Sequence, residues 1–187
     1  MNQKALTGAN SSPSKMLIAV LVLLNAVAPF SIDMYLAAFP QLAQDFSASA
    51  SMIQLTLTAF LVGMAGGQLF IGNLSDRYGR RRPLIIGSTV CVIASVLCIV
   101  AMSIQVLIFL RFVQGFAGAA GIVIARAIIT DRTSGLASAR LFGLMIGIGV
   151  LVPVAAPVLG GVIVTTFGWR AVFAALAAMS LLMLLGV

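Results

Sequence analysis

The stretch Gly72-Asn-Leu-Ser-Asp76-Arg77-Tyr-Gly79-Arg80-Arg81-Arg82-Pro83 separates two long apolar segments and holds four of the chain's 11 basic residues. A plain connection between two apolar helices needs only a turn and a few polar residues. Membrane topology alone explains a run of arginines, because basic loops stay on the cytoplasmic side. It does not explain an aspartate placed between two glycines. Asp76 can cap the following segment or pair with Arg80.

The composition indicates a membrane protein. The chain has 187 residues, of which 61% are hydrophobic and 8% charged, whereas soluble domains carry about 25% charged residues. The net charge of +7 lies in short connections rather than on one face, so it favours orientation in a bilayer over nucleic-acid binding. The absence of His and Glu removes common general bases and metal ligands. We therefore expect neither an enzyme nor a metal site.

The apolar pattern predicts an all-α membrane protein whose residues 16–187 form a six-helix bundle, since about 20 apolar residues cross a bilayer. The predicted spans are 16–38, 52–71, 84–102, 106–129, 141–164 and 171–187, and connections at 40–51, 72–83, 103–105, 130–140 and 165–170 join them. The polar, Ser-rich residues 1–15 are expected to be a disordered tail. The apolar run reaches Val187 without a polar tail, so we expect the N-terminal half of a longer chain.

Basic residues alternate between successive connections. The tail and the second and fourth connections carry most of them, while the first and third have none. By the positive-inside rule, this predicts a cytoplasmic N-terminus. Trp169 then falls at the outer edge of the last span, where it suits the interfacial aromatic belt. Asp131 lies on the same side as the basic hairpin, so Asp76, Arg80 and Asp131 can form a charge cluster.

Two ionisable residues inside predicted spans need a reason, because such groups are costly in lipid. Asp33 shares a helix face with Asn25 and Pro29, each four residues apart. It is either solvated near the headgroups or a carboxylate that takes up a proton on one side and releases it on the other. Arg111 either snorkels to the interface or, with Gln114 one turn on, belongs to a tightly packed inward surface. If Arg111 faces Asp33, the pair forms a proton-sensitive switch.

The fifth predicted span is rich in proline and glycine. Gly149, Pro153, Pro157 and Gly161 recur every four residues, with Gly160 adjacent. Prolines bend a helix and glycines allow close helix contact, so we expect a bent, closely packed helix; Gly143 and Gly147 add a G-x-x-x-G. Polar side chains that are candidates for a transport path, or else only bond neighbouring helices, are Asn25, Tyr35, Gln54 and Gln114.

Four segments resemble one family. The hairpin matches G-x-L-x-D-R-x-G-R-R, the signature loop of the major facilitator superfamily, at every defined position. Ser31-Ile-Asp33-Met-Tyr35-Leu36, Arg111-Phe-Val-Gln114-Gly115 and Ala156-Pro157-Val-Leu-Gly160-Gly161 are similar to motifs of its bicyclomycin/chloramphenicol-resistance group of drug:proton antiporters. The chain departs from that group at Ala37, where proline is usual, and at Ala156, where the common antiporter motif has glycine.

The resemblance implies a twelve-helix transporter in two bundles, with small amphipathic drugs and protons as its cargo and the bacterial inner membrane as its location. It implies no bound cofactor beyond the proton gradient. It assigns proton coupling to Asp33 and Arg111 and direction of transport to the helix with Pro153, Pro157, Gly160 and Gly161. A conformational latch is implied for Gly72, Asp76, Arg77, Gly79, Arg80 and Asp131.

The main hypothesis is thus proton-coupled multidrug efflux by alternating access, in which the C-terminal half of the same transporter completes the binding site. The nearest alternative is a proton symporter or facilitator for a small metabolite. A membrane scaffold or partner subunit without transport activity is the alternative from another class. A half-size transporter that works as a dimer is a further possibility.

Overall fold

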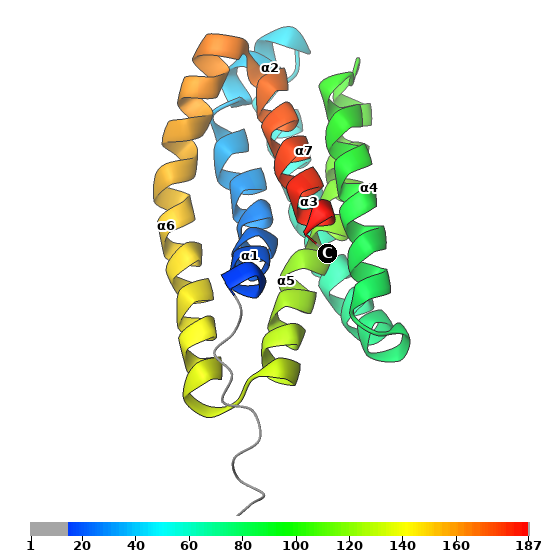
Figure 1. Ribbon diagram of the computed structural model, residues 1–187. Helices are drawn as coiled ribbons and strands as arrows, with labels where there is room; N and C mark the ends of the chain where they lie inside the picture. Colours follow the sequence, from blue (N-terminus) through cyan, green and yellow to red (C-terminus); the bar gives the residue numbers. More distant parts are fainter. Residues whose placement is uncertain (1–14, 187) are drawn as a thin grey trace, which may run out of the picture.

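A computed structural model describes residues 15–186, with side chains from residue 18 onward. The predicted tail, residues 1–15, lies outside this part of the chain except for Lys15, at which the first helix begins. Val187, the end of the last predicted span, also lies outside it. Figure 1 shows the helices running roughly side by side along one bundle axis.

Within residues 15–186 the backbone forms seven helices and no strand. They are α1 (Lys15–Leu36), α2 (Phe39–Asp45), α3 (Ala50–Tyr78), α4 (Arg81–Ile99), α5 (Ile104–Arg132), α6 (Gly135–Phe167) and α7 (Trp169–Leu185). Five of them, α1 and α3 to α6, are long and apolar enough to cross a membrane, and α7 is an apolar helix of 17 residues. The predicted all-α class is confirmed.

Four of the five connections are shorter than the sequence predicts, because the long helices continue past their apolar spans. With 29 residues, α3 is about 44 Å long at 1.5 Å per residue, against a hydrocarbon core of about 30 Å. The prediction of a loop over residues 72–83 is therefore wrong: helix continues to Tyr78, and only Gly79 and Arg80 separate α3 from α4. Gly79 has a φ of 81°, a backbone conformation that side chains other than glycine rarely adopt.

This correction also changes the local role of Asp76. It lies in the last turn of α3 and does not cap α4, whose N-cap Arg80 makes no side-chain cap hydrogen bond. The first predicted connection, residues 40–51, likewise contains a helix that the sequence analysis missed. α2 begins at Phe39 with Pro40 in its first turn, where the missing N–H of proline costs nothing.

α5 is the central helix of the bundle. It packs most extensively against α3 and also contacts α4 and α1, while α6 lies mainly on α1 and α7 on α4. The contact with α3 brings backbone against backbone: a Cβ atom added at Gly63 would lie 2.1 Å from the Phe112 carbonyl oxygen. One added at Gly115 would lie 2.1 Å from the Phe60 carbonyl oxygen. Close approach of this kind supplies the dispersion contacts that hold helices together in lipid.

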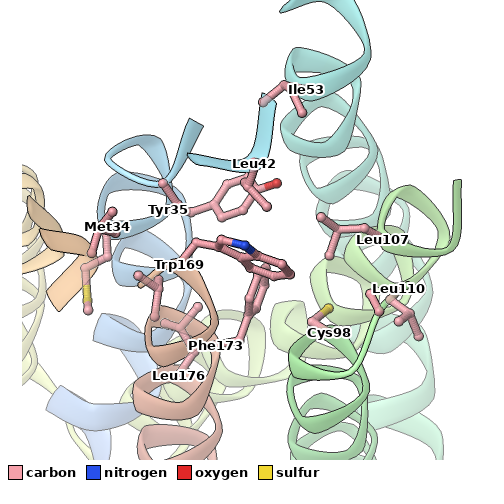
Figure 2. Close-up of a cluster of buried hydrophobic side chains, with 14 of the residues drawn as sticks. Met34, Tyr35, Leu42, Ile53, Cys98, Leu107, Leu110, Trp169, Phe173 and Leu176 are labelled. Carbon is pink, nitrogen blue, oxygen red and sulfur yellow. The ribbon is translucent and has the colours of Figure 1, made fainter. Parts of the chain in front are cut away.

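The buried apolar side chains form two clusters, one at each end of the bundle. We call the end where α3 and α5 finish, at Tyr78 and Arg132, the basic end. Figure 2 shows the cluster at the opposite end, where the ring of Phe173 of α7 packs against the rings of both Tyr35 of α1 and Trp169 of α7. Trp169 begins α7 at this end of the bundle, as predicted, but it is only 2% exposed, so its side chain packs inside the bundle and does not face lipid in an aromatic belt. The aromatic rings of this cluster fill the junction of α1, α2 and α7.

Candidate functional site

At the basic end, three charged residues from distant parts of the sequence meet. Nε of Arg80 donates to Oδ2 of Asp131 at 2.9 Å, and Nη1 of Arg80 bonds both Asp76 and the Ser75 hydroxyl. The two carboxylates raise the pKa of the Arg80 guanidinium, chiefly through the hydrogen bond that Arg80 donates to Asp131. The cluster thus joins the end of α3 to the end of α5 through the intervening turn.

The other hairpin residues are arranged around this charge cluster without joining it. The Arg77 guanidinium lies 5.5 Å from the centre of the Tyr78 ring, and Gly72 faces Val123 of α5. Gly79 supplies the positive φ of the turn. Because the Arg80 side chain is 30% exposed, each ion pair contributes only about 0–1 kcal/mol to stability. The arrangement suits a contact that forms and breaks; its role as a latch stays a prediction.

Arg111 lies in the interior of the bundle and is fully buried. Its Nη1 donates to Oε1 of Gln114 at 2.7 Å, and its Nη2 donates to the Ser31 carbonyl at 2.9 Å. The Gln114 amide then donates to the Ser95 hydroxyl at 2.7 Å, and Ser95 donates to the Cys91 carbonyl. A chain of hydrogen bonds therefore links α1, α5 and α4 through one guanidinium.

Aromatic rings complete the surroundings of Arg111. The guanidinium carbon lies 4.1 Å from the Tyr35 ring centre, 4.3 Å from that of Phe60 and 5.9 Å from that of Phe173. Such cation–π contacts offset part of the cost of removing the charge from water, about 2 kcal/mol or more for a desolvated pair. Nε has no hydrogen-bond partner among the described residues. The inward, packed interpretation of Arg111 therefore holds, and the snorkelling alternative does not.

Asp33 and Arg111 do not pair directly in this structure. Arg111 instead binds the Ser31 carbonyl, two residues before Asp33. The three ion pairs of the described residues involve the other carboxylates, Asp45, Asp76 and Asp131. Asp33 is half-buried near the outer end of α1. Arg111 thus contacts the segment of α1 that carries Asp33 through the backbone of Ser31 and not through the carboxylate.

The proline–glycine stripe of α6 is directed differently from the sequence prediction. Pro153 and Pro157 are exposed, and added Cβ atoms at Gly149 and Gly161 would meet nothing within 4 Å. The neighbouring face packs on α1, and there a Cβ at Gly160 would lie 2.5 Å from the Met34 carbonyl oxygen. Within the described residues, therefore, only Gly160 of this stripe packs closely, and close packing of its other members stays a prediction. Gly160 is the member that brings α6 against the residue next to Asp33.

The four polar candidates for a transport path also separate into different environments. Tyr35 and Gln114 are fully buried, with the Tyr35 hydroxyl 2.6 Å from that of Thr56, so neither lines an open path here. Gln54 is exposed on α3. Asn25 lines an open cavity of about 680 Å³ between α1, α5 and α6, and its amide donates to the Met145 carbonyl at 3.0 Å. Pro29, one turn from Asp33, lines the same cavity.

The end opposite the basic end has a polar contact that the sequence analysis missed. Gln41 of α2 donates to the Val164 carbonyl and accepts from the Trp169 backbone N–H, so it bridges α6 and α7. Asp45 accepts from Nε1 of Trp169 at 2.7 Å and pairs with Arg170 at 3.4 Å. The sequence signal that could have predicted α2, the helix that carries Gln41 and Asp45, was the dipeptide Phe39-Pro40, since proline in the first turn is typical of a helix start.

Comparison with known families identifies the chain. The model of the Major Facilitator Superfamily matches residues 21–187, which include α3 to α7, the basic hairpin and Arg111. The chain belongs to the Major Facilitator Superfamily. This facilitator chain therefore belongs to a family of multi-pass membrane transporters rather than of enzymes, as the sequence predicts.

Individual members of the family are similar to this chain over most of its length. An uncharacterized MFS-type transporter, YdgK of Bacillus subtilis, is 40% identical over 168 residues, 89% of this chain and 42% of the relative. The multidrug resistance protein MdtL of Shigella flexneri is 38% identical over 84% of this chain and 40% of its own length. The bicyclomycin resistance protein homolog of Haemophilus influenzae is 36% identical over 88% of this chain and 42% of its length. The chain thus spans about two fifths of these curated relatives.

Proposed function

We propose that this facilitator chain is the N-terminal bundle of a proton-coupled transporter that expels antibiotics or similar small amphipathic molecules from bacteria. One observation carries the coupling: of the chain's four acidic residues, Asp33 alone has no ion pair in the described residues. It lies inside a membrane-spanning helix, where a carboxylate without a partner is costly, and such a residue is therefore a candidate for a functional role. Relatives named for multidrug and bicyclomycin resistance support the class of cargo.

Protonation of Asp33 is the switch in this proposal. Neutral Asp33 tolerates an apolar environment, whereas ionised Asp33 favours exposure to water. Because Arg111 holds the Ser31 carbonyl and Gly160 of α6 touches Met34, a shift of this segment reaches both α5 and α6. Proton uptake from outside and release inside would thereby bias α1 between two arrangements, and no bound cofactor is needed beyond the proton gradient.

The working transporter in this proposal alternates access between two six-helix bundles, the second contributed by the C-terminal half of the same chain. The exposed apolar surfaces of α3 and α6 support this arrangement, because only 28% and 22% of their apolar windows are buried. A second bundle and the lipid of the inner membrane would share these surfaces. The positive-inside rule places the basic end and the N-terminus in the cytoplasm.

Replacement of Asp33 tests the coupling. In membrane vesicles containing the protein expressed from its complete gene, Asp33→Asn should abolish efflux driven by an imposed proton gradient while membrane insertion is retained. Asp33→Glu keeps a titratable carboxylate and should retain part of the activity. Wild-type rates of proton-driven efflux in Asp33→Asn would exclude this role for the residue.

The sign of coupling separates export from the alternatives. A gradient acidic on the outside should expel an amphipathic fluorescent drug from cells that express the protein. Accumulation under the same gradient would indicate a symporter. Absence of both transport and drug-induced proton release from the purified protein would favour a scaffold without transport activity.

The charge cluster at the basic end is proposed to stabilise the outward-facing state as a latch. Arg80→Ala removes both carboxylate bonds and should lower the transport rate about fivefold, as expected from about 1 kcal/mol of exposed ion pairing. Expression should not change. Arg81→Ala is the matched control, because Arg81 is exposed beside Arg80 and takes part in none of the described ion pairs. Equal rates in both variants would reduce the hairpin to a topological role.

A further inference from the structure

The open cavity between α1, α5 and α6 contains a charged residue that the coupling scheme does not use. Its walls are mainly apolar, and its polar side chains are Asn25 of α1 and Arg126 of α5. The remaining lining residues are Pro29, Ile122, Phe142, Met145, Ile146, Gly149 and Val150. A pocket with an apolar body and one cationic wall fits an amphipathic molecule with an electron-rich end.

No carboxylate of the described residues pairs with Arg126. Three of the four acidic residues, Asp45, Asp76 and Asp131, are engaged with Arg170 or Arg80. The fourth, Asp33, is eight residues beyond Asn25 on α1, about 12 Å along the helix axis. Arg126 makes no ion pair within the described residues. Its charge is therefore available to a molecule that enters the cavity.

The position of Arg126 differs from that of the other unpaired arginines at the basic end. Arg132 is the last residue of α5, whereas Arg126 lies six residues earlier, about 9 Å along the helix axis from that end, and its side chain is exposed. The buried amide of Asn25, which lines the same cavity, adds hydrogen-bonding capacity to it. Its bond to Met145 is its only side-chain hydrogen bond in the described part of the chain, so one N–H and the side-chain oxygen remain available.

We propose that Arg126 and Asn25 form a subsite for the carboxylate, or another anionic oxygen group, of a transported amphipathic molecule. The inference rests on the proposed function and adds to it the chemistry of one end of the cargo. Arg126 supplies the charge and paired N–H donors, Asn25 supplies the remaining N–H, and the apolar walls hold the body of the molecule. Cations, common among amphipathic drugs, bind poorly next to Arg126.

Binding of matched probes tests the subsite. The protein expressed from its complete gene is purified into phosphatidylcholine nanodiscs and titrated with radiolabelled 2-naphthoate, neutral 2-naphthamide and the 2-naphthylmethylammonium cation, with empty nanodiscs as the blank. The wild type should bind naphthoate about tenfold more tightly than naphthamide, the effect of a hydrogen bond to a charged group, and the cation least.

Substitutions then assign this preference to one residue. Arg126→Gln should bring the affinity for naphthoate down to that for naphthamide, while naphthamide binding stays unchanged. Arg126→Lys should retain part of the preference, because lysine keeps the charge without the paired donors. Arg132→Gln makes the same change of charge on the same helix outside the cavity lining, and it should leave the preference intact.

Each opposite outcome overturns the inference. The inference fails if the wild type binds no probe or binds naphthoate and naphthamide equally. It also fails if Arg126→Gln keeps the wild-type preference for naphthoate, or if Arg132→Gln loses as much of that preference as Arg126→Gln does. A preference that disappears when phosphatidylglycerol replaces part of the lipid would assign Arg126 to a lipid headgroup instead. Proton-driven efflux without charge preference refutes this subsite alone. Charge-selective binding without proton-driven efflux refutes the proposed function alone.

Discussion

The central helix α5 and the outer helix α6 look alike in sequence but use glycine in opposite ways. In α5, 61% of the apolar window is buried, against 22% in α6, and Figure 1 shows α6 along one side of the bundle. At the α3–α5 contact, Cβ atoms added to Gly63, Gly67 or Gly115 would come within 2.3 Å of a backbone carbonyl oxygen. Added Cβ atoms at Gly143 and Gly147 of α6 would meet nothing within 4 Å.

This difference shows that glycine spacing in a membrane helix does not identify the packed face. The G-x-x-x-G of α6 is open in this structure, whereas Gly63 and Gly67 of α3, four residues apart, make the closest contact with α5. The same glycine spacing occurs at a tight helix interface and on an open helix surface, so the spacing cannot distinguish them unless the neighbouring helix is known. The predictions below separate these two uses by adding one methyl group at a time.

The largest effect is expected at the α3–α5 contact. Gly67→Ala places a methyl group 2.3 Å from the Phe116 carbonyl oxygen, and backbone cannot yield as a side chain does, so the bundle should lose at least about 3 kcal/mol of stability. Reaction of a thiol-specific dye with the buried Cys91 and Cys98 during heating measures the loss. Gly66→Ala is the adjacent control, because its methyl group would lie 3.8 Å from the Phe116 ring. Equal melting of both variants would contradict the contact.

An intermediate effect is expected where α6 does touch the bundle. Gly160→Ala places a methyl group 2.5 Å from the Met34 carbonyl oxygen, next to Asp33. The exposed helix α6 can move outward, so the stability loss should be smaller, about 1–2 kcal/mol, while proton-driven efflux falls more than stability does. The neighbouring Gly161→Ala, with free space at its Cβ position, should leave both nearly unchanged. Parallel losses of stability and efflux would argue against a specific link to Asp33.

The smallest effect is expected at the open glycines of α6. Gly147→Ala adds a methyl group that meets nothing within 4 Å, and alanine favours helix over glycine by about 1 kcal/mol. Dye-reported melting of this bundle should therefore stay constant or rise slightly. A clear drop in melting temperature would show that Gly147 is packed against a partner outside the described residues.

The contacts or positions of some charged residues could be predicted from their spacing and neighbours in the sequence. Asp76 and Arg80 are only four residues apart in the sequence, and Asp131 shares their side of the membrane by the charge pattern. The inward position of Arg111 followed from Gln114 one turn away. Contacts that depend on which helices become neighbours were not predictable. Trp169 meets Asp45 across 124 residues, and Arg111 meets the Ser31 backbone rather than the Asp33 side chain across 80.

The sequence by itself determined the membrane class, the helical content and the basic end, because these depend on composition, apolar length and charge placement along the chain. It also placed a carboxylate, Asp33, inside the first span. Only the tertiary structure decided that the hairpin is a two-residue turn between long helices, which glycines touch backbone, and that Arg126 faces an open cavity while Arg111 is enclosed by aromatic rings. These outcomes depend on how each helix is rotated toward its neighbours, and packing across the whole bundle sets that rotation.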